Sequence, residues 1–125
     1  MLGEAELVAF VTTTDPERAA RFYGEVLGLT LRDRSEFALE FSAANARLRV
    51  AIAAHVDPAP GTVLGWRVDD VDATARRLLD RGVEPLRYDG LGQDALGVWR
   101  SPSGARVLWF ADPDGNVLSL TEPAA

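Results

Sequence analysis

The stretch "FVTTTDPERAARFYGEVLGL" (residues 10–29) contains the end of a strand, a helix start and a helix stop. The β-rich apolar run 7–13 stops just before Asp15, and an Asp followed by Pro16 is typical of an N-cap and a first helical position. Apolar residues at 19, 22, 23 and 26 then recur at helical spacing, and Gly28 is a typical residue to end the helix. Three strand-like runs at 29–34, 37–42 and 46–53 follow.

The same order recurs after the Pro-rich link 55–61. We predict a strand at 62–69, a helix at 70–82 and strands at 84–88, 96–100, 105–111 and 116–122. Asp69 to Gly82 has the same separation as Asp15 to Gly28. Because the link is too short for a flexible tether, we predict one domain, 1–125, with an internal duplication into modules 1–57 and 58–125.

One helix for three or four strands covers only one face of each module's strands. The other face must therefore be buried or enclose something. The sequence accordingly predicts an α+β fold, in which two tandem βαβββ modules form a curled mixed sheet that encloses a cleft.

Composition excludes several kinds of chemistry. The chain has no cysteine and no lysine, which excludes disulfides, thiolate nucleophiles, sulfur-based zinc sites and lysine Schiff bases. Its net charge of −6 argues against a nucleic-acid partner. No apolar run approaches the roughly 20 residues of a membrane span, and no export signal is visible, so we expect a cytoplasmic protein without a membrane partner.

The quoted stretch, with its Asp cap, "FY" pair and "LG" stop, together with "FADPDGNVLSL" (110–120), resembles the vicinal oxygen chelate superfamily. This superfamily includes glyoxalase I, ring-cleaving dioxygenases, fosfomycin resistance enzymes and bleomycin resistance proteins. The resemblance covers nearly the whole chain. It implies a homodimer, because members commonly pair, but it does not imply one activity, because one scaffold hosts many functions.

Metalloenzymes of this superfamily hold a divalent ion through four side chains, from the first and last strand of each half. The matching positions here are Val8, Arg49, Val63 and Ser119. Valine has no lone pair, arginine repels a cation and offers no acceptor, and one serine binds a metal weakly at best. The resemblance and these residues together predict a protein without a metal or other cofactor.

We therefore predict a metal-free small-molecule-binding protein, in which apolar side chains enclose the ligand and a few polar side chains bond to it. Arg49 suits a carboxylate or phosphate of the ligand, or alternatively pairs with an acid on a neighbouring strand such as Glu40. Strand parity places Trp66 on the helix-packing face, whereas Trp109 has no assignment. The predicted ligand-binding residues are Val8, Phe10, Arg49, Val63, Arg67, Trp99, Ser119 and Thr121.

Other functions stay open at this point. One is a lyase, isomerase or dioxygenase whose metal is relocated or absent, and a metal-free enzyme would act through Arg49 or through Tyr23 and Tyr88. Another is a non-catalytic interaction module. The only histidine, His55, is the first residue of the link, outside the expected strands. The identity and charge of the ligand, and whether any reaction is catalysed, are not determined.

Two further segments invite a functional reading. "DPDG" (112–115) alternates acidic residues as a calcium loop does, but its glycine is the fourth residue rather than the sixth, so we predict a tight Asx-type turn. The glycine-rich segment 89–97 is not followed by a helix, which argues against a phosphate loop. We predict a mobile hairpin loop there, or a lid over the cleft.

Overall fold

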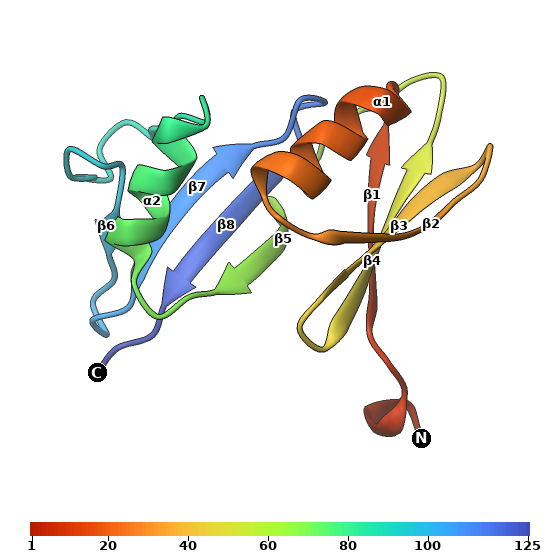
Figure 1. Cartoon of the computed structure of the whole chain (residues 1–125). Coiled ribbons are helices and arrows are strands. Elements are labelled where there is room, and N and C mark those ends of the chain that lie inside the picture. Colours follow the sequence, from red (N-terminus) through yellow and green to blue (C-terminus); the bar gives the residue numbers. More distant parts are fainter. The chain divides into compact units, whose positions relative to one another are not determined.

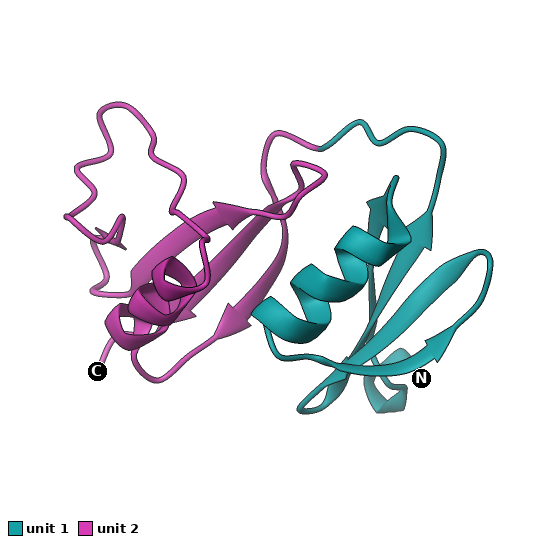
Figure 2. Cartoon of the chain, turned by 45° about the horizontal axis from the view of Figure 1, so that its top comes forward, with its two compact units in different colours: residues 1–58 teal, residues 59–125 magenta.

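The computed structural model of the chain describes residues 1–125, which divide into two compact units, Met1–Pro58 and Ala59–Ala125 (Figure 2). This division lies one residue from the module boundary expected from the sequence. Each unit contains one four-stranded mixed sheet, and neither sheet is closed. The α+β class and the tandem modules are thus confirmed, but the strands form two sheets and not the single curled sheet that was predicted. The single domain stays a prediction.

Unit 1 has the sheet order β1-β4-β3-β2, with β1 parallel to β4 and the other pairs antiparallel (Figure 1). A short 3₁₀ turn precedes β1, and α1 continues into a π-helical segment, η2. In chain order the elements are η1 (Leu2–Glu4), β1 (Val8–Thr13), α1 (Pro16–Ala19), η2 (Ala20–Val26), β2 (Thr30–Arg34), β3 (Ala38–Ala43) and β4 (Ala46–Ile52).

The first helix begins and ends as its sequence predicts. The Asp15 carboxylate accepts a hydrogen bond from the backbone N–H of Arg18 at 3.1 Å, and Pro16 occupies the first helical position, where no N–H is needed. At the other end, Gly28 has a φ of +80°, a left-handed conformation that favours glycine. The cap and the stop therefore follow from local chemistry.

Unit 2 repeats this plan, with the sheet order β5-β8-β7-β6 and β5 parallel to β8. The N-cap of its helix is Asp70, whose carboxylate accepts a hydrogen bond from the N–H of Ala73 at 3.0 Å. The equal separation of Asp69–Gly82 and Asp15–Gly28 had suggested Asp69 as the cap. In chain order the elements are β5 (Thr62–Arg67), α2 (Val71–Asp80), β6 (Trp99–Arg100), β7 (Arg106–Ala111) and β8 (Val117–Glu122).

The predicted strand at 84–88 is absent, and β6 is only two residues long. Pro85 has no backbone N–H, and Tyr88 gives its N–H to the side chain of Gln93 at 2.7 Å. Only Leu86 contributes a backbone bond to the sheet, from its N–H to the carbonyl of Trp109 at 2.8 Å. This segment therefore lies along the part of the β7 edge that β6 does not reach.

The helix of each unit covers one face of that unit's sheet. In unit 2, α2 is also attached through charge, because Arg106 on β7 pairs with Asp72 at 2.6 Å and with Glu122 at 3.8 Å. The hydrogen bond that Arg106 donates to the Asp72 carboxylate raises the pKa of Arg106. None of the helices is long and apolar enough to span a bilayer. The buried residues of the covered faces are Val11, Leu39, Phe41, Leu48 and Val50 in unit 1 and Leu108, Phe110, Leu118 and Leu120 in unit 2.

Candidate functional site

The sheet face opposite the helix in each unit carries the side chains predicted to bind a ligand. Successive side chains of a strand point to opposite faces, so residues that alternate with the buried ones lie on the uncovered face. We call these surfaces open face 1 and open face 2. Open face 1 includes Val8, Phe10, Glu40, Ser42, Arg47 and Arg49, and open face 2 includes Gly65, Arg67, Trp99, Val107, Trp109, Ser119 and Thr121.

On open face 2, strand pairing brings small, polar and aromatic side chains into one row. Gly65, Ser119 and Trp109 are neighbours across β5, β8 and β7. A Cβ atom at Gly65 would lie 2.7 Å from the Ser119 hydroxyl, so the glycine leaves room for that hydroxyl. The next row contains Arg67 and Thr121, also predicted ligand residues. The structure thus brings four of the predicted residues, including Trp99 beside Val107, onto one surface.

Three rings form an aromatic cluster on this face: Tyr88, Trp99 and Trp109. The centroid of Trp109 lies 5.9 Å from that of Trp99, in a tilted arrangement. It lies 5.5 Å from that of Tyr88, in an edge-to-face arrangement. Trp109 was not assigned from the sequence, although its strand partner is Ser119. The cluster offers aromatic ring faces and edges next to hydroxyl groups, which suits a ligand with an aromatic or apolar part.

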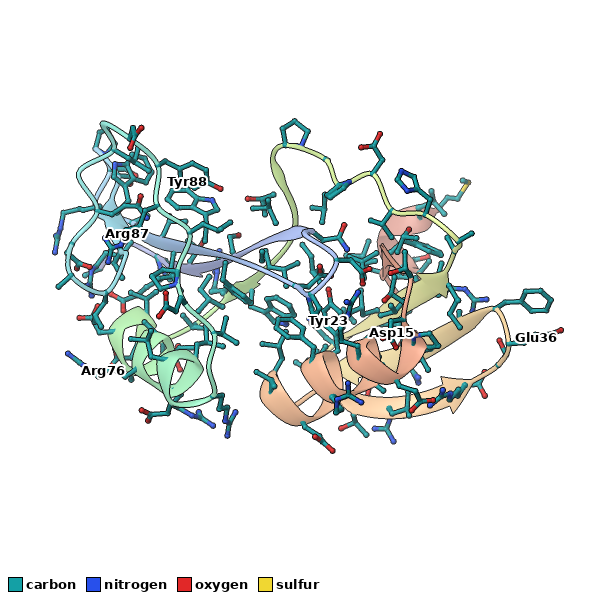
Figure 3. All side chains as sticks on the ribbon, turned by 90° about the horizontal axis from the view of Figure 1, so that it is seen from above. Asp15, Tyr23, Glu36, Arg76, Arg87 and Tyr88 are labelled. Carbon is teal, nitrogen blue, oxygen red and sulfur yellow. The ribbon has the colours of Figure 1, made fainter.

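A network of side-chain hydrogen bonds supports the segment that carries Tyr88. The Gln93 amide donates to the carbonyls of Leu86 and Gly97, both at 2.8 Å. The Arg87 guanidinium donates to the carbonyls of Asp94 and Ala95. Arg87 and Tyr88, both labelled in Figure 3, are successive residues of this segment. The loop predicted to be mobile is therefore well bonded, and its role as a lid stays a prediction.

Open face 1 is charged where open face 2 is aromatic. Phe10, Arg49 and Glu40 are neighbours across β1, β4 and β3. Arg49 pairs with Glu40 at 3.8 Å, which confirms the internal ion pair that was one of its two predicted roles. Arg47 lies two residues before Arg49 on β4 and on the same face. It pairs with the same carboxylate at 3.7 Å and with Glu6 at 3.5 Å.

The four positions matched to the superfamily's metal ligands do not fit a metal ion. Val8 is exposed on β1, and Val63 lies where the β5 pairing shifts between Thr62 and Leu64. Arg49 is paired with a carboxylate, and Ser119 offers a single hydroxyl. Moreover, no three His, Cys, Asp or Glu side chains gather as a metal site requires. No step of a reaction can be assigned to a metal on these residues.

Several other candidates lie away from the open faces. Tyr23 is buried in unit 1 against Phe22 and Phe41, at 1% exposed, so its side chain is not accessible to a ligand. Trp66 stacks on the buried Phe110 with centroids 6.4 Å apart, as its strand parity predicted. His55 is exposed in the link.

The Asx-type turn at 112–116 is confirmed. The Asp112 carboxylate accepts from the N–H groups of Asp114 and Asn116 at 3.0 and 2.9 Å, and from the Asn116 side chain at 2.8 Å. Both carboxylate oxygens are thus occupied by donors within the turn. This turn also determines the partner of Ser119, because Trp109 and Ser119 are equally distant from Asp114 along the chain. Counting outward from the turn is the signal that would have identified Trp109.

Comparison with known proteins agrees with this fold. The family model described as the Glyoxalase/Bleomycin resistance protein/Dioxygenase superfamily matches residues 6–120. No curated protein matches the chain significantly. Among solved structures, a member of that superfamily from Sphaerobacter thermophilus DSM 20745 is 22% identical, with a TM-score of 0.76 over 98% of this chain and 100% of the other.

Two further structures are similar over most of their length. Lactoylglutathione lyase from Agrobacterium tumefaciens is 19% identical, with a TM-score of 0.74 over 95% of this chain and 93% of the other. A glyoxalase/bleomycin resistance protein/dioxygenase from Alicyclobacillus acidocaldarius is 17% identical, with a TM-score of 0.69 over 95% and 91%. At these identities the similarity shows the fold and not the activity. With a family model that spans nearly all of its residues, the chain belongs to the Glyoxalase/Bleomycin resistance protein/Dioxygenase superfamily.

Proposed function

We propose that the chain is a small-molecule-binding protein that acts as a homodimer and needs no metal ion. The observation that carries this proposal is the aromatic cluster beside Ser119 and Thr121 on open face 2. Aromatic rings with a few hydroxyl and guanidinium groups nearby are typical of ligand sites. The apolar side chains of such a site contact most of the ligand's surface, and its polar side chains fix the orientation of the ligand. The ligand contacts we propose here are Arg67, Tyr88, Trp99, Trp109, Ser119 and Thr121.

The side chains at the superfamily's metal positions support a metal-independent function. Two valines and an ion-paired arginine supply no electron pair to a cation, so at most one of the four positions holds a donor. Binding by stacking and hydrogen bonding requires none of these positions to ligate a metal. It also requires no general base, and the only imidazole, His55, lies in the link.

The first experiment measures metal content. The purified protein is incubated with Ni²⁺, Zn²⁺, Fe²⁺ or Mn²⁺, desalted and analysed for bound metal by mass spectrometry. We expect far less than one ion per chain. Stoichiometric uptake would overturn the metal-free proposal and favour a lyase, isomerase or dioxygenase of this superfamily.

The second experiment tests the aromatic cluster. A thermal-shift screen of neutral, cationic and anionic planar compounds selects ligands, because a compound that binds the folded state raises its melting temperature. Hits are then titrated against the wild type, Trp109→Ala and Trp109→Phe, with Phe37→Ala as the control at an exposed apolar residue of the β2–β3 turn. We expect Trp109→Ala to weaken binding about ten-fold or more, Trp109→Phe to weaken it less, and Phe37→Ala to leave it unchanged. Equal affinity in all four proteins would refute the site.

The dimer is tested on the same samples. Sedimentation velocity over a range of protein concentrations gives the mass of the species in solution. We expect twice the mass of one chain, and a monomer at all concentrations would remove the homodimer from the proposal.

A further inference from the structure

A pair of arginines on open face 1 has more hydrogen-bonding capacity than the protein uses. Arg47 and Arg49 occupy successive outward positions on β4, which are about 6.6 Å apart along a strand. Glu40, on the neighbouring strand, lies between them: one carboxylate oxygen is 3.7 Å from Arg47 and the other is 3.8 Å from Arg49. One carboxylate is thus shared by two guanidinium groups.

These distances are too long for hydrogen bonds, which have N···O separations of about 2.7–3.2 Å. Neither guanidinium donates a hydrogen bond to any other group, and the remaining partner of Arg47 is Glu6, at 3.5 Å. Each guanidinium carries five N–H donors in a planar fork that matches the oxygens of a carboxylate or a phosphate. The donors of both arginines are therefore available to an oxyanion that approaches more closely than Glu40 does.

The surroundings of the pair are balanced in charge and partly shielded from water. A third guanidinium, that of Arg32, donates to the hydroxyl of Ser42 at 2.8 Å, and Ser42 is the strand partner of Arg47. Three arginines thus meet three carboxylates on this face, those of Glu6, Asp33 and Glu40, so the face is close to neutral although the whole chain has a net charge of −6. The side chains of Arg47 and Arg49 are 32% and 39% exposed, so a ligand can reach them while solvent screening is reduced.

An apolar side chain lies directly beside the charges. Phe10 on β1 is the strand partner of Arg49 and is 62% exposed. A small molecule that places an oxyanion on the arginines can therefore lay an apolar body on this ring.

We propose that Arg47 and Arg49 form an oxyanion site on open face 1, and that Glu40 is an internal carboxylate that the ligand's own carboxylate or phosphate displaces. This inference goes beyond the proposed function, because it adds a second site, on open face 1 and not on open face 2, for a ligand with a negative charge. Glu40 holds the two guanidinium groups near one another in the absence of ligand. Because it competes with the ligand, it also lowers the affinity for oxyanions.

The test uses two probes, inorganic phosphate and benzoate, with methyl benzoate as the neutral control. Calorimetric titrations compare the wild type with Arg47→Gln, Arg49→Gln and Glu40→Gln. Arg76→Gln is the matched control, because Arg76 lies on an exposed position of α2 (Figure 3). Circular dichroism verifies that each variant is folded.

We expect Arg47→Gln and Arg49→Gln each to weaken oxyanion binding about ten-fold or more, because each removes charge-assisted hydrogen bonds. Glu40→Gln removes the competing carboxylate and strengthens binding by about the same factor, whereas Arg76→Gln leaves it unchanged. If benzoate binds more tightly than phosphate and loses that advantage in Phe10→Ala, the ligand is an organic oxyanion. Tighter binding of phosphate, with no effect of Phe10→Ala, indicates an inorganic or phosphate-type oxyanion on the same arginines.

Two outcomes overturn the proposal: no oxyanion binding even in Glu40→Gln, or binding that is indifferent to both arginines. The titrations also separate this inference from the proposed function. Neutral planar ligands that bind through Trp109, while oxyanions do not bind, would leave the proposed function standing without the oxyanion site. Oxyanion binding that depends on the arginines, while no planar ligand is weakened by Trp109→Ala, would support the oxyanion site and refute the aromatic one.

Discussion

Replacing Asp112 with alanine is expected to destabilise the protein strongly, although the residue lies in a turn. Asp112 is only 5% exposed, and its carboxylate accepts three hydrogen bonds of 2.8–3.0 Å from Asp114 and Asn116. Asn116 is itself buried, at 6% exposed, so two of the three donors would lose their acceptor in a place with little access to water. A hydrogen bond to a charged group contributes about 1.5–3 kcal/mol, but losses within one cluster are not additive. We expect Asp112→Ala to lower the free energy of unfolding by about 2–4 kcal/mol.

Urea unfolding followed by circular dichroism measures this loss. At about 4 °C per kcal/mol for a chain of this size, the melting temperature should fall by about 8–16 °C. Asp57→Ala removes the same charge from an exposed residue of the link and should change the free energy of unfolding by less than about 0.5 kcal/mol. Asp112→Asn keeps one acceptor oxygen and should lie between the two. If Asp112→Ala and Asp57→Ala unfold at the same urea concentration, the turn does not contribute the stability that we assign to its hydrogen bonds.

Three further outcomes are expected. Gly97→Ala and Gly90→Ala both place a side chain at positive φ, but only at Gly97 would the new Cβ lie 2.4 Å from Pro85. In parallel urea titrations, Gly97→Ala should therefore lower the free energy of unfolding by about 1–3 kcal/mol more than Gly90→Ala does. The hydrogen bond from Arg34 lowers the pKa of Glu17 below its usual 4.5, so its small stabilising effect is present above that pH and is lost as the pH falls through the lowered pKa. Arg34→Gln should return this pKa toward 4.5 in an NMR titration of the Glu17 carboxylate, and an unchanged pKa would contradict the pairing. Calcium at millimolar concentration should leave the melting temperature unchanged, because the Asx turn already uses both oxygens of its central carboxylate; a clear rise would restore the calcium-loop reading.

The features that the sequence predicted correctly are those encoded by neighbouring residues. The Asp15 cap, the Gly28 stop and the Asp112 turn each depend on groups within a few positions along the chain, so the residue types alone indicate them. The two βαβββ modules follow in the same way from apolar periodicity and from the repeated order of elements. Even here a local error occurred, because Asp69 and Asp70 are equally good caps by residue type and only Asp70 bonds to the helix.

Contacts between strands were decided by the tertiary structure. The run 84–88 has strand-like composition, but Pro85 and the Gln93 side chain take away the backbone bonds that a strand needs. The sharing of Glu40 by two arginines depends on the pairing of β3 with β4, and the ring contact of Tyr88 with Trp109 depends on how the segment after α2 lies along β7. Local patterns specify which face of a strand is apolar, whereas the partner across the sheet is set by register and packing over the whole unit. The sequence by itself therefore determined the fold and the lack of donor side chains at Val8, Arg49 and Val63, and only the tertiary structure separated the aromatic open face from the charged one.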